Sequence, residues 1–311
     1  MKKDRHYLLY LGIIGLFFIS KIVFAQEITL TNEIIHFDKY KDFDLQGFTV
    51  TDKYLVAILI SDDENESIIK VYDKENFTEI KSIYGGSLGH ANDITYNNEN
   101  NLLYVIDNGN KDVHLFEATS LKYLKTIESD ITLRSLTYVE DKDYFVARNF
   151  TTGYILDSDL KLVSQKPFII GLNVSSNIAR QGWAYWQDKI YYATWSWIRM
   201  GGDGTSTIYV YNLKGNKLDE LKIAKEAGEL EDVAFMDDMI LLGFNGYDNY
   251  VSFYLEKLDD KPTELVLEQP DEKIEDEKTL VKRKPYGLVG LVLLFLISLF
   301  IIRKKAKISK S

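Results

Sequence analysis

A pattern of short strands recurs five times along the middle of this chain, and the recurrence limits the possible folds more than any other feature. Each copy begins with a pair of polar or small residues and continues with a short apolar strand, a turn rich in Asp, Asn or Lys, and a second strand of larger apolar residues. The copies begin at Leu45, Ala91, Leu133, Arg180 and Leu230, and their first apolar anchors are Phe48, Ile94, Leu136, Trp183 and Val233, which are 46, 42, 47 and 50 residues apart. Spacings of this order, with strands and turns inside each unit, are typical of propeller blades.

A third strand follows in every copy, and a fourth strand follows in all copies but the last. Third strands with alternating apolar and polar residues are predicted at residues 67–73, 112–117, 152–157, 207–212 and 250–256. Fourth strands are predicted at residues 77–83, 122–128, 161–168 and 218–224. Four such strands make one twisted antiparallel sheet. The sequence therefore predicts an all-β domain, a five-bladed β-propeller that spans residues 26–268.

The fifth copy needs a fourth strand from elsewhere in the chain. Residues 27–37 form an unassigned strand at the opposite end of the domain, and its pairing with the last blade would close the ring and remove an exposed sheet edge. Residues 263–268 are the competing candidate for the same position.

The second copy is the most regular of the five. Its sequence, LLYVIDNGNKDVHLFEATSLKYLKTI at residues 102–127, resembles the repeat of the YVTN and NHL-type propellers, in which a Tyr-Val strand, an Asn/Gly turn and a strand ending in Asp recur. The likeness covers all five copies loosely and residues 90–127 well. Members of these families mostly have six or seven blades, whereas this chain has five copies. The resemblance implies a fold and carries no activity.

The first 25 residues have the three parts of a secretory signal peptide. A basic start precedes an apolar run at residues 7–20, and Ala25 provides a small residue before Gln26. We expect cleavage after Ala25. An uncleaved anchor helix is the alternative, although Lys21 interrupts the run and its length falls short of the ~20 residues that a spanning helix needs.

A second apolar run, at residues 286–302, contains no charged residue over 17 positions. The basic residues on both sides of it can reach the membrane interfaces, so we expect a single transmembrane helix. An acidic spacer with a basic end (residues 269–285) precedes this helix, and a basic cytoplasmic tail (residues 303–311) follows it. Because the leader is exported, the propeller is expected at the cell surface, outside the cell membrane. The short basic leader, the composition rich in Lys, Asn and Ile, and the basic tail are typical of a Gram-positive bacterium.

The predicted extracellular part is strongly acidic. The chain has 37 Lys and Arg against 47 Asp and Glu, but 12 of the basic residues and only one acidic residue lie in residues 1–25 and 282–311, which leaves a net charge of −21 on the residues between them. Such a surface repels nucleic acid and anionic polymers. The chain has no cysteine, which excludes disulfides, a thiol nucleophile and a cysteine zinc site, so the domain depends on its core alone.

The repeat alignment places a polar pair of each copy at one mouth of the predicted channel, where the inner strands begin. The first members of the pairs are Gln46, Asn92, Arg134, Gln181 and Glu231, and the second members are Gly47, Asp93, Ser135, Gly182 and Asp232. Such side chains either bind a ligand or satisfy buried amides and channel water. Both possibilities are open from the sequence.

The tryptophans give a second indication of recognition. All four, Trp183, Trp186, Trp195 and Trp197, fall within 15 residues of the fourth copy. Trp183 is expected in the core, while Trp195 and Trp197 share a strand face that leads into a long loop, IRMGGDGTST. Paired tryptophans beside a channel form a platform for sugars, aromatic groups or cations, and long loops in compact folds are often functional. The alternative is that both rings pack under the loop.

The same polar ring contains candidate residues for metal binding and for catalysis. Asn92, Asp93 and Glu231 are candidate ligands for a calcium ion at the channel mouth, although Arg134 in the ring opposes a purely cationic ligand. Gln46 and Gln181 stand where a glycosidase would need carboxylates. A metal-dependent hydrolase of the lactonase type would use Glu231, Asn92 and Asp93.

These observations favour a binding protein over an enzyme. The first hypothesis is a membrane-anchored extracellular propeller that binds a small-molecule, glycan or protein ligand, or acts as a scaffold for another membrane protein. The predicted ligand-binding residues are Gln46, Asn92, Asp93, Arg134, Gln181, Trp195, Trp197, Glu231 and Asp232. The alternative is the lactonase-type hydrolase.

Overall fold

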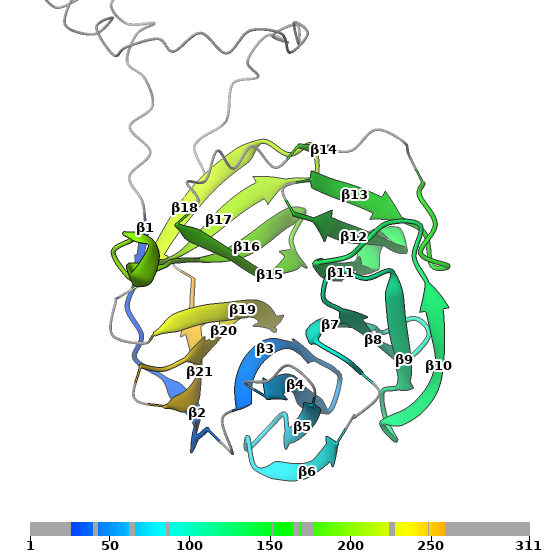
Figure 1. Ribbon diagram of the computed structural model, residues 1–311, viewed down its shortest axis with the longest axis horizontal. Helices are drawn as coiled ribbons and strands as arrows, with labels where there is room; N and C mark the ends of the chain where they lie inside the picture. The colour runs from blue at the N-terminus through cyan, green and yellow to red at the C-terminus, as the bar shows by residue number, and fades with distance from the viewer. Residues whose placement is uncertain are drawn as a thin grey trace, which may run out of the picture. The chain divides into compact units, whose positions relative to one another are not determined.

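Five small β-sheets stand in a ring around a central channel in the computed structural model (Figure 1), which confirms the expected five-bladed β-propeller. The structure describes residues 26–39, 43–61, 66–84, 88–150, 152–163, 168–169, 177–223, 228–247 and 249–258. Each blade has four antiparallel strands, and the innermost strand of each lines the channel.

The strands follow the predicted order in every blade. Blade 1 contains β3 (Phe43–Val50), β4 (Tyr54–Ser61), β5 (Ser67–Asp73) and β6 (Glu79–Tyr84); blade 2 contains β7 (Ala91–Asn97), β8 (Leu102–Asp107), β9 (Asp112–Glu117) and β10 (Lys122–Glu128). Blade 3 contains β11 (Ser135–Val139), β12 (Tyr144–Asn149), β13 (Thr152–Leu156) and β14 (Phe168–Ile169); blade 4 contains β15 (Ile178–Trp186), β16 (Lys189–Ser196), β17 (Ser206–Asn212) and β18 (Lys217–Ile223). Blade 5 contains β19 (Glu229–Met236), β20 (Met239–Asn245), β21 (Tyr250–Lys257) and β2 (Glu33–Asp38). Two short 3-10 turns, η1 (Glu140–Lys142) and η2 (Ile198–Met200), complete the described elements.

The N-terminal segment closes the ring, but it does so in two pieces. β2 pairs antiparallel with β21 and supplies the missing strand of blade 5, as the sequence predicted for residues 27–37. The first part of that segment, β1 (Gln26–Ile28), instead pairs in parallel with β18 on the outer edge of blade 4. The carboxylate of Glu256 accepts hydrogen bonds from the amides of Thr31 and Asn32 (2.5 and 2.8 Å), which holds the chain between the two strands. The competing residues 263–268 lie outside the described part of the chain.

The outer edge of blade 3 differs from the prediction of a strand at residues 161–168. Asp157 Oδ1 accepts hydrogen bonds from the amides of Asp159 and Lys161 (3.0 and 2.9 Å), so a turn occupies the start of this stretch. Among the described residues of this stretch, an isolated bridge between Leu156 and Leu162 and the short strand β14 remain of the predicted pairing, and residues 164–167 lie outside the described part of the chain.

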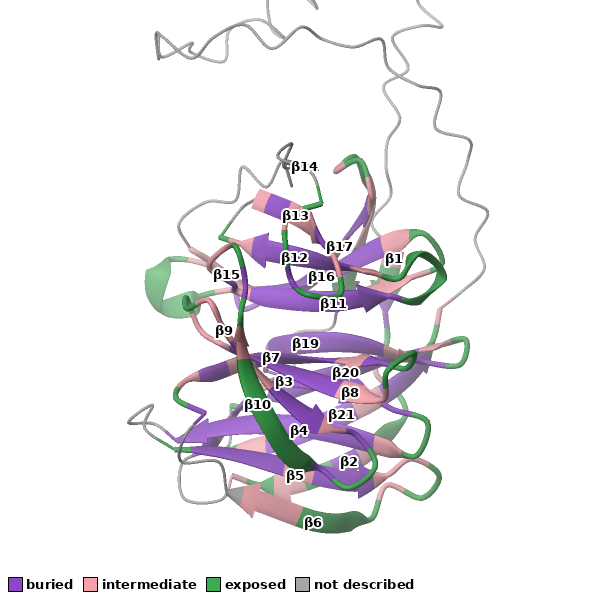
Figure 2. Cartoon of the chain, turned by 90° about the vertical axis from the view of Figure 1, so that its right-hand side faces the viewer, coloured by how far each residue is buried: buried purple, intermediate pink, exposed green. Residues whose placement is uncertain are grey.

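The hydrophobic core lies between the blades. Five clusters of buried apolar side chains occupy the five interfaces between neighbouring sheets. Each predicted anchor belongs to one of them and is at most 3% exposed: Phe48, Ile94, Leu136, Trp183 and Val233. Figure 2 shows the gradient, with buried inner strands and an exposed outer strand β10. The ring therefore closes with its own strands and every interface is filled, and the compact unit that contains the ring ends at Pro262.

The predicted signal peptide (1–25), spacer (269–285), transmembrane helix (286–302) and tail (303–311) lie outside the described residues. In the part of the chain that the structure does describe, no helix has the length and apolar character needed to span a membrane.

Candidate functional site

Four of the five inner strands are irregular where the sequence predicted the polar ring. The pairing register shifts between Leu45 and Gly47, Ala91 and Asp93, Arg180 and Trp183, and Leu230 and Asp232. A β-bulge at such a point redirects the side chain of the extra residue. The bulges therefore explain why Gln46, Asn92, Gln181 and Glu231 turn toward the channel mouth, and Arg134 reaches it from the position just before β11.

These side chains gather around one cavity of about 560 Å³, which we call the glutamate mouth. It contains seven of the nine predicted residues: Gln46, Asn92, Arg134, Gln181, Trp195, Trp197 and Glu231. Further lining residues, outside the predicted ligand-binding set, include Lys39, Asp44, His90, Asn108, Arg180, Glu229, Asn245 and Tyr247. Several of these lie in the loops beside the inner strands, where the repeat alignment gave no common position.

Asp93 and Asp232 are placed differently from the expectation. Both are about 1% exposed and lie below the cavity, inside the channel wall. Asp93 Oδ2 accepts hydrogen bonds from Ser135 Oγ (2.5 Å) and from the amide of Leu136 (3.0 Å) in blade 3. Asp232 Oδ2 accepts one from the amide of Phe48 (2.9 Å) in blade 1. The two carboxyl groups join neighbouring blades and do not line the cavity.

Two glycines make room for these aspartates. A Cβ atom on Gly182 would lie 2.0 Å from Asp232 Oδ1, and one on Gly47 would lie 2.8 Å from the Cα atom of Asp93. Burial raises the pKa of Asp93 to about 6, and burial together with the charge of Asp93 raises the pKa of Asp232 well above its usual range. The fully buried Arg148 lowers both pKa values through its charge. Along the inner strands these groups lie between the residues that line the two ends of the channel, and we call this level the constriction.

Side chains at the glutamate mouth bridge every pair of adjacent blades. His90 Nε2 lies 3.3 Å from Gln46 Oε1, and Asn92 donates to the carbonyl of Arg134 (2.7 Å). The remaining three bridges run from Arg148 to the Gln181 carbonyl (2.8 Å), from Gln181 Nε2 to Glu229 Oε1 (2.8 Å), and from Asn245 Nδ2 to the Leu45 carbonyl (3.1 Å). The mouth is therefore a connected polar ring with fixed positions.

The carboxyl groups of this ring favour the protonated form. Burial, with the nearby charge of Asp44, raises the pKa of Glu229 to about 7. Burial and the charge of Glu229 raise the pKa of Glu231 well above its usual range. The described hydrogen bonds use one oxygen of each group, from Gln181 to Glu229 and from Asn245 to Glu231 (2.6 Å). A carboxylate can accept more bonds than this.

Three donors at the same mouth have no acceptor within the described protein. The Nε atoms of Arg134 and Arg180 and the Nε1 atom of Trp195 are shielded from solvent and have no hydrogen-bond partner. The other end of Arg134 is held by Asn108 (2.5 Å) and by the ring of Phe150, 4.6 Å from the guanidinium carbon. Buried donors are nearly always paired in folded proteins, so these three mark a place where an acceptor is missing.

The predicted tryptophan pair borders this place. The ring centres of Trp195 and Trp197 are 6.2 Å apart at an angle of 48°. Trp195 is partly buried, while Trp197 is 42% exposed. The loop after them folds back, because the Trp197 carbonyl accepts hydrogen bonds from the amides of Met200 and Gly202 (3.0 and 2.8 Å). The loop thus supports Trp197 without covering it.

The proposed calcium ligands do not form one cluster. Asp93 lies in the channel wall, and Asn92 and Glu231 contact different partners from different blades. Among the described residues, no group of three or more His, Asp or Glu side chains has an arrangement that could hold a metal ion.

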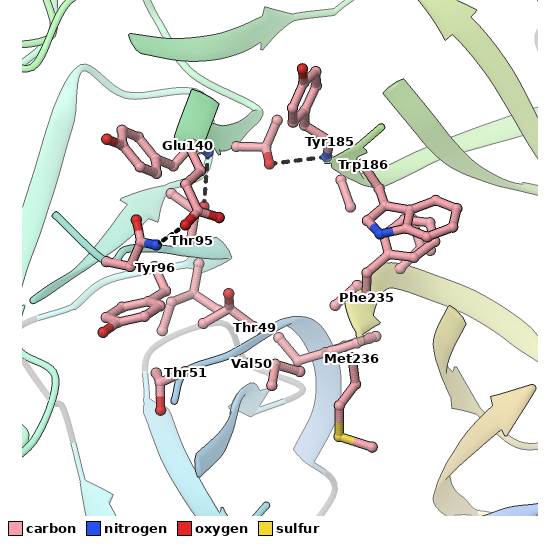
Figure 3. Close-up of a pocket in the computed structure, with 18 of the residues that line it drawn as sticks. Thr49, Val50, Thr51, Thr95, Tyr96, Glu140, Tyr185, Trp186, Phe235 and Met236 are labelled. Atoms are coloured by element: carbon pink, nitrogen blue, oxygen red, sulfur yellow. Dashed lines mark hydrogen bonds between the residues drawn. The ribbon is translucent and has the colours of Figure 1, made fainter. Parts of the chain in front are cut away.

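The opposite end of the channel opens into a larger cavity of about 810 Å³, which the sequence did not predict as a site. We call it the threonine mouth, after Thr49, Thr95 and Thr137 (Figure 3). Thr95 and Thr137 accept hydrogen bonds from the amides of Tyr138 and Tyr185 in the next blade (3.1 and 3.2 Å). At its rim, Lys142 bonds to Asp141 (2.8 Å), Asp188 (2.5 Å) and Tyr185 (3.0 Å). These polar groups bond to one another and to the backbone.

Comparison with known proteins supports the fold and nothing finer. No protein-family model and no curated protein matches the chain. Among solved structures, a glutaminyl cyclase from Myxococcus xanthus matches with a TM-score of 0.54 at 11% identity, covering 76% of this chain and 100% of that one. A chain of a nidogen/laminin complex matches with a TM-score of 0.42 at 12% identity, covering 65% of this chain and 72% of that one. At such identities the likeness is one of fold.

Proposed function

We propose that this chain is a membrane-anchored extracellular β-propeller that binds a ligand or protein partner at the glutamate mouth. The anchor is the helix at residues 286–302, and the signal peptide, spacer and tail have the boundaries derived from the sequence. The resemblance to YVTN and NHL-type repeats belongs to the same proposal. Nothing in it requires nucleic acid.

One observation carries the proposal: three shielded donors that have no acceptor among the described residues surround a single cavity. They are the Nε atoms of Arg134 and Arg180 and the Nε1 atom of Trp195. Leaving a buried donor unpaired costs about 1–3 kcal/mol. A ligand that brings acceptors to this cavity recovers that energy.

The rim of the glutamate mouth supports a contact with a partner. Large apolar side chains are exposed there by 42–56%, namely Trp197, Ile198, Met200, Tyr247 and Phe150. Tyr247 contacts the tryptophan loop by donating to the Gly204 carbonyl (3.4 Å), and Phe150 packs on Arg134. Exposed apolar groups gathered around polar ones are typical of interaction sites.

Glycan and peptide arrays probed with residues 26–262 test the proposal. We expect binding that Trp195→Ala and Trp197→Ala each weaken about tenfold or more, because stacking and indole contacts of this size are typical of such platforms. A matched control is Trp186→Ala, at the threonine mouth. Binding that is absent, or that both tryptophan variants leave unchanged, contradicts the proposal.

Hydrolysis in the same cavity is the second candidate function, and Glu229 is the observation that favours it. A carboxyl group with a pKa of about 7 beside a cavity suits general acid and base chemistry at neutral pH. The lactonase-type form of this candidate needs a calcium ion, for which the described residues offer no cluster of three or more His, Asp or Glu ligands. A rise in melting temperature with calcium that EDTA and Glu231→Ala both abolish, together with lactone turnover, would support it over binding alone.

A further inference from the structure

The glutamate mouth has two walls of unlike chemistry. Blades 3 and 4 supply Arg134, Arg180 and the indole of Trp195, which present nitrogen donors. Blades 5 and 1 supply Glu229, Glu231 and Asp44, which present carboxyl oxygens. In the ring of five blades, blade 3 lies opposite the junction of blades 5 and 1 (Figure 1).

We propose that the ligand of the glutamate mouth is a small zwitterion, with an ammonium group on the carboxylate wall and a carboxylate on the donor wall. This inference rests on the proposed function and names its ligand class. A free amino acid or an ω-amino acid has the required chemistry.

The donor wall selects for an anionic acceptor. Arg Nε and indole Nε1 can donate and cannot accept, so only an acceptor satisfies them. Three donors in one cavity match the several lone pairs of a carboxylate better than a single carbonyl. Arginine also forms its strongest hydrogen bonds with carboxylates.

The carboxylate wall selects for a cation. Glu229 lies close enough to Glu231 that its charge raises the pKa of Glu231, and the charge of Asp44 raises the pKa of both groups. Lys39 is the cation already present, and it pairs with Asp44. An ammonium group that approaches Glu229 would donate a hydrogen bond to the second oxygen of that carboxyl group and favour its ionised form.

The platform between the walls suits a short aliphatic or aromatic chain. Trp195 lies on β16 and Trp197 directly after it, and both line the cavity together with Tyr247. Aromatic faces bind methylene groups and cations alike. A large polyanion does not fit this arrangement, because it would meet the carboxylate wall and the acidic surface.

Isothermal titration of residues 26–262 with the series glycine, β-alanine, 4-aminobutyrate, 5-aminopentanoate and 6-aminohexanoate tests the inference. The series varies the distance between the two charges, so the best member measures the distance between the walls. Butylamine and butyrate carry one charge each. We expect at least one member of the series to bind about tenfold or more tightly than either of them.

Two substitutions test the carboxylate wall and the donor wall independently. Glu229→Gln is expected to weaken the best amino acid about tenfold or more and to leave butyrate unchanged, whereas Arg180→Gln is expected to weaken the amino acid and butyrate alike. Glu140→Gln, at the threonine mouth, is the matched control and is expected to bind like the wild type. Thermal melts confirm that each variant is folded.

The outcomes distinguish this inference from the proposed function. If the amino acids bind no better than butylamine or butyrate while Trp195 and Trp197 still support binding on an array, the ligand class is wrong and the binding site stands. If neither amino acids nor arrays show binding that depends on these tryptophans, both proposals are contradicted.

Discussion

At the threonine mouth, Thr95, Thr137 and Lys142 all have hydrogen-bond partners. At the glutamate mouth, three donors have no partner among the described residues, and the described hydrogen bonds use one oxygen of each of two carboxyl groups. The threonine mouth is the larger cavity, at about 810 Å³ against 560 Å³. Volume alone therefore favours the threonine mouth, whereas the unsatisfied polar groups favour the glutamate mouth as the place of the proposed ligand.

The rims of the two mouths also differ, in the exposure of their large apolar side chains. Of the nine large apolar residues that are most exposed among those described, Trp197 and Tyr247 line the glutamate mouth and none lines the threonine mouth. At the threonine mouth Trp186 is stacked on Phe235, with ring centres 4.6 Å apart and planes 6° from parallel. Aromatic side chains therefore serve packing at one end and remain accessible at the other.

The largest expected effect on stability comes from an added methyl group at the constriction between the two mouths. Gly182→Ala places a methyl group against Asp232 Oδ1 and is expected to cost about 3 kcal/mol of unfolding free energy. In the double variant with Asp232→Ala, the clashing carboxyl group is gone, so the cost of the alanine at position 182 should fall well below its cost in the wild type. Urea denaturation of the four proteins measures this coupling, and strictly additive losses would contradict the packing account.

The next effect is a pH dependence that originates at the glutamate mouth. Burial raises the pKa of Glu229 to about 7 in the folded protein, so between pH 4.5 and 7 the folded state holds a proton that the unfolded state has lost. The free energy of unfolding therefore decreases as pH rises through this window. Glu229→Gln removes this contribution. Between pH 4.5 and 8, the free energy of unfolding of the variant should therefore fall by about 2 kcal/mol less than that of the wild type.

Denaturation by urea at pH 4.5, 6 and 8 measures how the free energy of unfolding of each protein changes with pH. Asp44 raises the pKa of Glu229 and Lys39 lowers it, so the comparison with the variant isolates the contribution of the one carboxyl group. Equal pH dependence of the unfolding free energy in the two proteins would show that Glu229 ionises with its ordinary pKa, which contradicts the account.

A pair of tryptophan substitutions tests the contrast between the rims. Trp186→Ala removes the stack on Phe235 and is expected to lower the unfolding free energy by about 1–2 kcal/mol with no effect on binding. Trp197→Ala removes an exposed ring and should change stability by less than about 0.5 kcal/mol while it weakens binding. Melting curves and titrations of the same two proteins show whether the effects divide in this way, and a loss of binding in Trp186→Ala alone would reverse the assignment.

The smallest effect is expected at the rim of the threonine mouth. Lys142 is partly exposed and pairs with Asp141 and Asp188, and such surface ion pairs contribute about 0–1 kcal/mol. Lys142→Met should therefore lower stability by at most about 1 kcal/mol, and less in 1 M salt. Binding at the other mouth should not change, and a changed affinity would mean that the two mouths are coupled.

The sequence predicted the part of the fold that repeats. Five polar pairs and five anchors at near-constant spacing were enough to predict the blades and five lining residues of the glutamate mouth, and the tryptophan pair added two more. Closure by the N-terminal segment was one of two candidates that the sequence left open. The sequence could not tell which member of each pair faces the cavity. That is decided by a bulge in the inner strand and by glycines such as Gly182, whose missing side chain gives the space that Asp232 fills.

The remaining lining residues show why sequence reasoning ended where it did. Arg180 and Glu229 lie just outside the aligned pairs, and Tyr247 comes from the loop between the second and third strands of blade 5, which differs in sequence from the equivalent loops of the other copies. Their convergence depends on the tertiary structure of blades 4 and 5. Glu229, two residues before Glu231 on β19, was the one available signal, because its charge raises the pKa of Glu231.

The tryptophan indole signals of ¹⁵N-labelled residues 26–262 test the central claim most directly. The chain has four tryptophans; Trp195 and Trp197 line the glutamate mouth, while Trp183 and Trp186 line the threonine mouth. On addition of the best-binding amino acid of the series, the account predicts that the Trp195 and Trp197 signals shift and the Trp186 signal does not. Shifts confined to Trp183 and Trp186 would contradict it.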